Sequence, residues 1–100
     1  MRSIYTIWPE LSKNEKWVVS IWVAFPLLAL FCAILQRFLF PVFADNAALI
    51  SLFGQMLPLH YVATIFLHAS LAKNRHISLF STVLMYLYGV AVFMTALFIL

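Results

Sequence analysis

The chain has 100 residues, of which 66% are hydrophobic and only 9% are charged, and its formal net charge is +3. Soluble domains carry about 25% charged residues, so this composition excludes a water-soluble globule and predicts that lipid covers most of the surface. The length allows one domain, and the dispersed basic residues argue against binding to nucleic acid. The single cysteine, Cys32, excludes an intrachain disulfide and a paired-cysteine metal motif.

Residues 1–16 form an arm of mixed polarity before the first apolar run. Because tryptophan and tyrosine rings favour the headgroup zone, we expect this arm to lie on the membrane surface. Ser12 and Glu15 match a capping box, which predicts that the first long helix begins near Lys13. Within the arm, apolar residues at spacings of three and four predict a short helix: Ile4, Ile7, Trp8 and Leu11.

Residues 18–40 form an apolar segment long enough to cross a bilayer. Pro26 lies inside it and has no N–H, so the carbonyl near Trp22 should lose its helical partner, and a neighbouring helix can satisfy it instead. Ala29 and Ala33 form a small-residue pair that allows close helix approach. The segment is longer than the apolar core of a signal peptide, and the arm before it carries glutamates, so we expect it to be retained.

Residues 41–46 form a turn that carries Asp45. Arg37 lies about one helical turn earlier, where its side chain can reach the headgroups and pair with Asp45, although a simple interfacial anchor also explains it. The second apolar segment, residues 47–72, contains no Asp, Glu, Lys or Arg and has Pro58 near its middle. We therefore expect a second membrane-crossing helix there.

A basic turn at residues 73–76 leads to a third apolar segment, residues 77–100, in which Gly89 permits a close helix crossing. Because both connections are short, we expect an all-α membrane protein with three antiparallel transmembrane helices and a short interfacial arm. The positive-inside rule predicts a bacterial inner-membrane protein with a cytoplasmic N-terminus and a periplasmic C-terminus. Its basis is the basic residues of the arm and the second turn, namely Arg2, Lys13, Lys16, Lys73 and Arg75.

A polar stripe marks the second apolar segment. His60, Thr64 and His68 follow one another at intervals of four residues, so they share one face of a helix. Ser51 and Gln55 fall on roughly the opposite face. Since ionisable groups within a bilayer face protein rather than lipid, we expect the histidine face to contact the other helices.

Few cofactors suit these side chains. Haem needs two axial ligands that converge on one iron, whereas His60 and His68 are separated by about 12 Å along one helix face. Zinc needs closer ligands and a third group nearby. A quinone needs only one or two donors beside an apolar slot, for which His60, His68, Arg75 and His76 are the candidates. We expect no metal, and quinone or haem only in a complex; the alternative is that both membrane histidines hydrogen-bond across helices.

Two family resemblances involve the same segment. Pro26, Leu39-Phe40-Pro41 and His68-Ala69 followed by His76-Ile77 resemble the three-helix anchor subunits of fumarate reductase. That resemblance implies a menaquinone site at the inner end of the second helix, with His68 beside it. Phe66-Leu67-His68 is similar to the end of the second helix in the small subunit of haem-copper quinol oxidases. Because the two resemblances are incompatible, we assign the chain to neither family.

The sequence is poor in catalytic patterns. It has no nucleophile–base pair, no glycine-rich phosphate loop and no soluble catalytic domain, so we expect that the chain is not an enzyme. The favoured function is an accessory or anchoring subunit that contacts the bilayer, other membrane subunits or further copies of itself. One alternative is a respiratory anchor that contributes to a quinone or haem site, and another is a small immunity or pore-modulating membrane protein.

Overall fold

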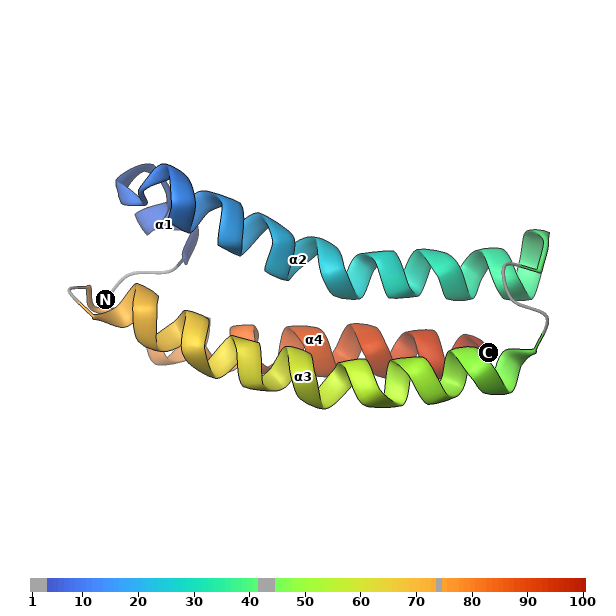
Figure 1. Cartoon of the computed structure of the whole chain (residues 1–100). Coiled ribbons are helices and arrows are strands. Elements are labelled where there is room, and N and C mark those ends of the chain that lie inside the picture. Colours follow the sequence, from blue (N-terminus) through green and yellow to red (C-terminus); the bar gives the residue numbers. More distant parts are fainter. Residues whose placement is uncertain (1–3, 42–44, 74) are drawn as a thin grey trace.

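The structure is a computed structural model that describes residues 4–41, 45–73 and 75–100. Within these ranges the chain is helical and has no strand. In chain order the elements are α1 (Ile4–Ile7), the 3₁₀ turn η1 (Trp8–Glu10), α2 (Lys13–Ile34), the π-helical turn η2 (Leu35–Leu39), α3 (Asn46–Ala72) and α4 (Leu79–Ile99). The three long helices lie alongside one another, with α1 at one end of α2 (Figure 1).

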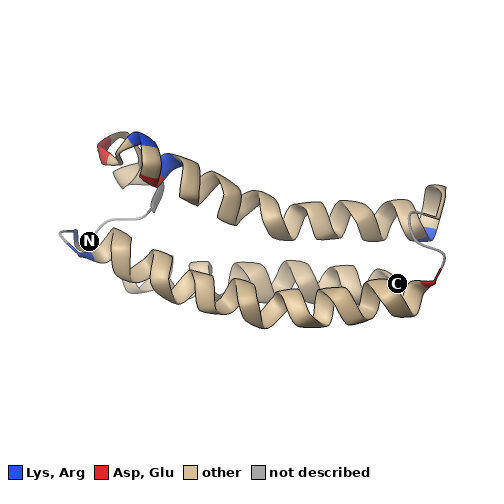
Figure 2. Cartoon of the chain, viewed as in Figure 1, with Lys and Arg blue, Asp and Glu red and all other residues tan. Residues whose placement is uncertain are grey.

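Within the described residues, three helices are long and apolar enough to cross a membrane: Lys13–Leu39, Asn46–Ala72 and Leu79–Ile99. The described Lys, Arg, Asp and Glu residues lie toward the two ends of the bundle, and its middle length contains none of them (Figure 2). The prediction of an all-helical chain with three helices of membrane-spanning length is therefore confirmed.

The first long helix begins where its capping residues predict. The Glu15 N–H donates to Oγ of Ser12 (3.2 Å), and the Ser12 N–H donates to Oε1 of Glu15 (3.0 Å), so the capping box is complete. These two bonds satisfy backbone donors that a helix start would otherwise leave open. The helix accordingly starts at Lys13 and continues through the π-helical turn to Leu39.

The other two helices begin at positions that differ slightly from the predicted spans. The Asp45 carboxylate accepts from the Ala47 N–H (2.9 Å), so α3 starts one residue earlier than expected. The Ser78 hydroxyl accepts from the Ser81 N–H (3.1 Å), so α4 starts two residues later. In both cases a polar residue caps the helix: Asp45 was expected in the turn, and Ser78 was expected within the helix.

The interior of the bundle contains two clusters of buried apolar side chains. One cluster joins the arm to the near end of the bundle, where Ile7 is fully buried and Leu11 is 5% exposed. The apolar side of the arm is therefore covered by the bundle. The members of this cluster are Ile7, Leu11, Val19, Leu67, Leu71 and Met85. The second cluster includes the predicted small-residue pair and consists of Ala29, Ala33, Leu49, Phe53, Phe93 and Ala96.

Candidate functional site

The centre of the bundle is organised around the backbone carbonyl of Trp22. Pro26 has no N–H to donate to this oxygen, and Nε2 of His60, from α3, lies 2.9 Å from it. Because a carbonyl oxygen only accepts hydrogen bonds, Nε2 carries the hydrogen and donates it. The sequence predicted that this carbonyl would lose its helical partner, and the structure identifies the side chain that replaces it.

Further hydrogen bonds connect all three long helices at the same level. Nε1 of Trp22 donates to Oγ1 of Thr64 (2.8 Å), and that hydroxyl donates to the carbonyl of His60 (2.8 Å). From α4, the Tyr88 hydroxyl donates to the carbonyl of Val23 (2.6 Å). These five residues, Trp22, Val23, His60, Thr64 and Tyr88, form what we call the central network.

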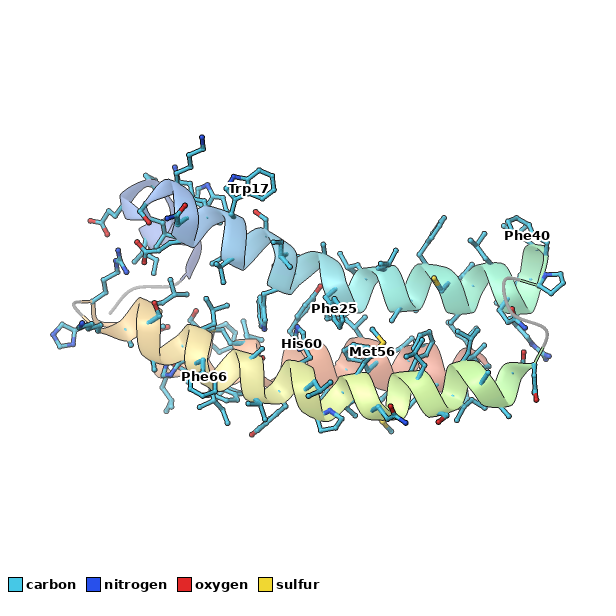
Figure 3. The ribbon with its side chains drawn as sticks, in the orientation of Figure 1. Trp17, Phe25, Phe40, Met56, His60 and Phe66 are labelled. Carbon is cyan, nitrogen blue, oxygen red and sulfur yellow. The ribbon has the colours of Figure 1, made fainter. Side chains whose placement is uncertain are left out.

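Aromatic rings surround the imidazole of His60, which is 5% exposed. The Trp22 and Phe25 rings are nearly parallel to it, with centroids at 5.4 and 6.4 Å, and Phe93 meets it edge-on at 5.8 Å. Phe25 and His60 point toward one another between α2 and α3 (Figure 3). These contacts restrict rotation of the imidazole and so keep Nε2 aimed at the carbonyl.

Gly89 on α4 makes room for this imidazole. A Cβ atom added at Gly89 would lie 2.3 Å from Nδ1 and 2.7 Å from Cε1 of His60, which is far inside van der Waals contact. Gly89 is buried, so the methyl group of an alanine at this position would have no open space to occupy. Gly89 was predicted to permit a close helix crossing, and in the structure the space beside it holds the His60 side chain.

His68 lies two helical turns further along the same face of α3, and it is half-buried. Its Nε2 lies 3.2 Å from Oγ1 of Thr82, whose hydroxyl already donates to the carbonyl of Ser78 (3.1 Å). The histidine must therefore be the donor in this bond, with the hydrogen on Nε2. The Tyr86 ring packs edge-on against the imidazole at 5.8 Å. Both membrane histidines thus hydrogen-bond to another helix.

The end of the bundle near the arm carries an ion pair. The Arg75 guanidinium donates to Oε2 of Glu15 (3.1 Å) and to the carbonyl of Leu71 (3.3 Å), which ties the turn after α3 to the start of α2. His76 is exposed beside it. Both side chains of the pair are half-buried, and an ion pair near a protein surface contributes about 0.2–1 kcal/mol.

The opposite end of the bundle is held by neutral amides. Gln36 donates to the side-chain oxygen of Asn46 (2.9 Å), and Asn46 donates to the carbonyl of Leu100 (3.5 Å). Arg37 is exposed, and within the described residues it makes no ion pair with Asp45. The interfacial-anchor interpretation therefore suits Arg37 better than a pairing with Asp45.

The four candidate cofactor-binding residues have separate surroundings. His60 bonds to α2, His68 to α4 and Arg75 to Glu15, while His76 faces outward. In the part of the chain that the structure describes, no group of three or more His, Cys, Asp or Glu side chains is placed to hold a metal ion. The structure does not bring these four side chains to one point.

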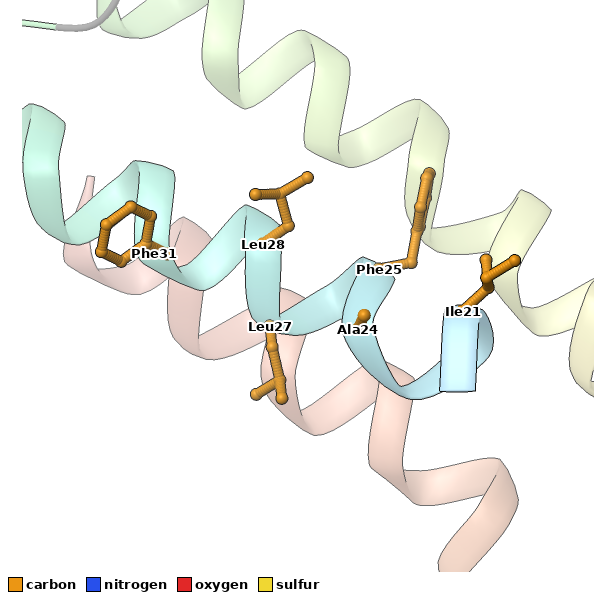
Figure 4. Close-up of a pocket in the computed structure, with 6 residues that line it drawn as sticks. All are labelled: Ile21, Ala24, Phe25, Leu27, Leu28 and Phe31. Atoms are coloured by element: carbon orange, nitrogen blue, oxygen red, sulfur yellow. The ribbon is translucent and has the colours of Figure 1, made fainter. Parts of the chain in front are cut away.

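Several hollows on the outer surface are lined by residues of α2, and two of them include residues beside the imidazole of His60. The larger, about 500 Å³, is lined only by apolar residues of α2 itself, including Ala24, Phe25 and Phe31 (Figure 4). The smaller, about 290 Å³, lies between α2 and α3 beside Trp22 and His60. Both hollows are open and apolar, so they suit lipid chains, and the hydrogen-bond donors of the central network point away from them into bonds within the chain.

Part of the central network was not predicted from the sequence. Trp22 was predicted to take part only through its carbonyl, and no role was predicted for Val23 or Tyr88. A signal was available for Trp22, because a tryptophan that lies one turn before a membrane proline can donate to a helix facing the freed carbonyl. For Tyr88 no local pattern exists, since its bond to Val23 depends on how α4 crosses α2.

A comparison with protein-family models finds no match to this chain, and comparisons with curated proteins and with solved structures also find none.

The two glycines offer a matched test of the packing around His60. Gly89→Ala should lower the free energy of unfolding by about 1–3 kcal/mol, because the methyl group overlaps the imidazole. A Cβ at Gly54 would have nothing within 4 Å, so Gly54→Ala should be neutral or stabilising by up to about 1 kcal/mol. Unfolding by sodium dodecyl sulfate in mixed micelles measures both. Equal effects of the two substitutions would show that the imidazole does not occupy the space beside Gly89.

Proposed function

We propose that this chain is an inner-membrane accessory or anchoring subunit without catalytic chemistry of its own, which acts through helix–helix contacts. The observation that carries this proposal is the state of the central network. Its four side-chain N–H and O–H donors, on Trp22, His60, Thr64 and Tyr88, each already donate to a group of this chain. Among the described residues, no buried polar side-chain atom lacks a hydrogen-bond partner. This supports a structural role for the polar side chains of the bundle, which hold the helices together.

We further propose that the three long helices are antiparallel in the bilayer of a bacterial inner membrane, with the arm in the cytoplasmic interface and the C-terminus in the periplasm. The distribution of charge supports this orientation (Figure 2). Lys13, Lys16, Lys73 and Arg75 lie toward the end where α2 starts and α3 ends, whereas Arg37 lies at the other end. The positive-inside rule favours the more basic end on the cytoplasmic side.

A respiratory anchor remains the second candidate, and one observation favours it. The hollow between α2 and α3 is lined by aromatic and apolar side chains and reaches the His60 ring. A quinone ring could enter such a slot from the lipid. Its oxygens would have to compete with the Trp22 carbonyl for the His60 donor, so we rank this function below the first.

The accessory function predicts a stable association in native membranes. Solubilisation in a mild detergent, followed by affinity capture of the tagged chain, should recover a defined membrane polypeptide or a second copy of the chain. Bound quinone or haem, detected by lipid extraction and an optical spectrum of the captured material, would favour the respiratory anchor instead. A monomer that captures neither protein nor cofactor would contradict both functions.

The orientation can be tested with reporters fused after Leu100. Alkaline phosphatase, which is active only in the periplasm, should be active at this position, and a green fluorescent protein fused there should stay dark. Fusions truncated after Lys73, in the turn between α3 and α4, should show the opposite pattern and serve as the control. A fluorescent protein that lights up after Leu100 would overturn the proposed orientation.

A further inference from the structure

The second membrane proline frees a carbonyl in the same way as the first. Pro58 lies within α3 and has no N–H, so the carbonyl of Gly54, one turn earlier, loses its regular helical donor. At Pro26 the corresponding oxygen is satisfied by His60. No side chain of the described residues donates a hydrogen bond to the Gly54 oxygen.

This carbonyl lies on the outer face of α3. Gly54 and Pro58 are both exposed, and a Cβ added at Gly54 would meet nothing within 4 Å. The opposite side of α3 faces the interior of the bundle and carries the buried residues Leu49, Phe53 and His60. We therefore expect a donor for the Gly54 carbonyl from outside the described residues.

Gln55 is the next residue along α3 and is also exposed. Its side-chain amide makes no hydrogen bond within the described residues. With a rise of about 1.5 Å per residue it is roughly 14 Å from the start of α3, which is near the middle of a hydrocarbon core of about 30 Å. Water is absent at that depth, so both the amide and the freed carbonyl need a protein partner.

We infer that α3 pairs with α3 of a second copy of this chain through Gln55 and Gly54. This inference rests on the proposed function and names one of its helix contacts. Copies of one chain in the same orientation present the same residues at the same depth. A two-fold axis between the two helices places each Gln55 amide opposite the Gly54 carbonyl of the other copy, so two reciprocal hydrogen bonds form.

A second copy suits this face better than a lipid or a different subunit. Lipid tails offer neither a donor nor an acceptor, whereas the face itself offers both: the Gln55 amide donates, and the Gly54 carbonyl accepts. Small side chains let the two helix backbones approach closely. On the exposed side of the first half of α3 these are Ala47, Ala48, Ser51 and Gly54.

Energy transfer between two fluorescently labelled populations in phosphatidylethanolamine–phosphatidylglycerol vesicles tests the dimer. Cys32 is the single cysteine of the chain, so Cys32→Ser removes the native thiol. Lys73→Cys in that background then provides one site for the fluorescent label. Gln55→Leu should weaken dimerisation at least about tenfold, because both reciprocal bonds are lost. Pro58→Ala should also weaken it, since the new N–H satisfies the Gly54 carbonyl. Thr95→Val, an exposed polar-to-apolar change on α4, should leave dimerisation unchanged.

Cysteine cross-linking tests which face is involved. In the Cys32→Ser background, oxidation should cross-link Ser51→Cys into a dimer and leave Thr95→Cys monomeric. A wild-type chain that stays monomeric at every lipid dilution, or a Gln55→Leu variant that dimerises as well as the wild type, would overturn this inference. If that chain still captures a different subunit from native membranes, the proposed function stands while the α3 pairing fails.

Discussion

A carbonyl that loses its helical partner inside a bilayer is costly, and the described bundle is arranged around one such group. Pro26 removes the donor for the Trp22 oxygen, and His60 supplies another from a different helix. An unsatisfied polar group in an apolar environment costs about 1–3 kcal/mol or more. That penalty applies to any arrangement in which α3 moves away from α2. The bond therefore favours one register between two helices whose apolar packing alone would allow several. Gly89 then allows α4 to close over the imidazole.

The two prolines of the membrane helices each free one carbonyl, and the two carbonyls face in different directions. The oxygen freed by Pro26 faces the interior, and a side chain of the same chain reaches it. The oxygen freed by Pro58 faces outward at Gly54, next to the Gln55 amide. Within a membrane the second arrangement calls for another protein surface. The internal bond thus contributes to the tertiary fold, and the outward-facing pair is the basis of the α3 pairing proposed above.

Much of the fold was predictable because its causes are local. The uncharged runs predicted three helices, Ser12 and Glu15 predicted the start of α2, and the period of four placed His60, Thr64 and His68 on one inner face. Pro26 predicted which carbonyl would be free. The remaining features depend on how helices cross. α3 starts one residue earlier than expected because Asp45 caps it, and α4 starts two residues later because Ser78, which was expected within the helix, is its cap.

The identity of the site residues was less predictable than their location. The sequence left open whether the histidines bind a cofactor or bridge helices, because an imidazole suits both roles. Only the geometry shows that Nε2 of each histidine donates to another helix. The hydrogen bonds of Trp22 and Tyr88 could not be read from spacing, since each joins helices far apart in sequence.

A double-mutant cycle between Pro26 and His60 tests the central claim most directly. In the wild-type background, His60→Leu leaves the Trp22 carbonyl without a donor and should lower the free energy of unfolding by about 1–3 kcal/mol. In a Pro26→Ala background the restored N–H satisfies that carbonyl, so the same substitution should cost at least about 1 kcal/mol less. If His60→Leu costs the same in both backgrounds, His60 does not serve the carbonyl that Pro26 frees, and this account of the bundle is wrong.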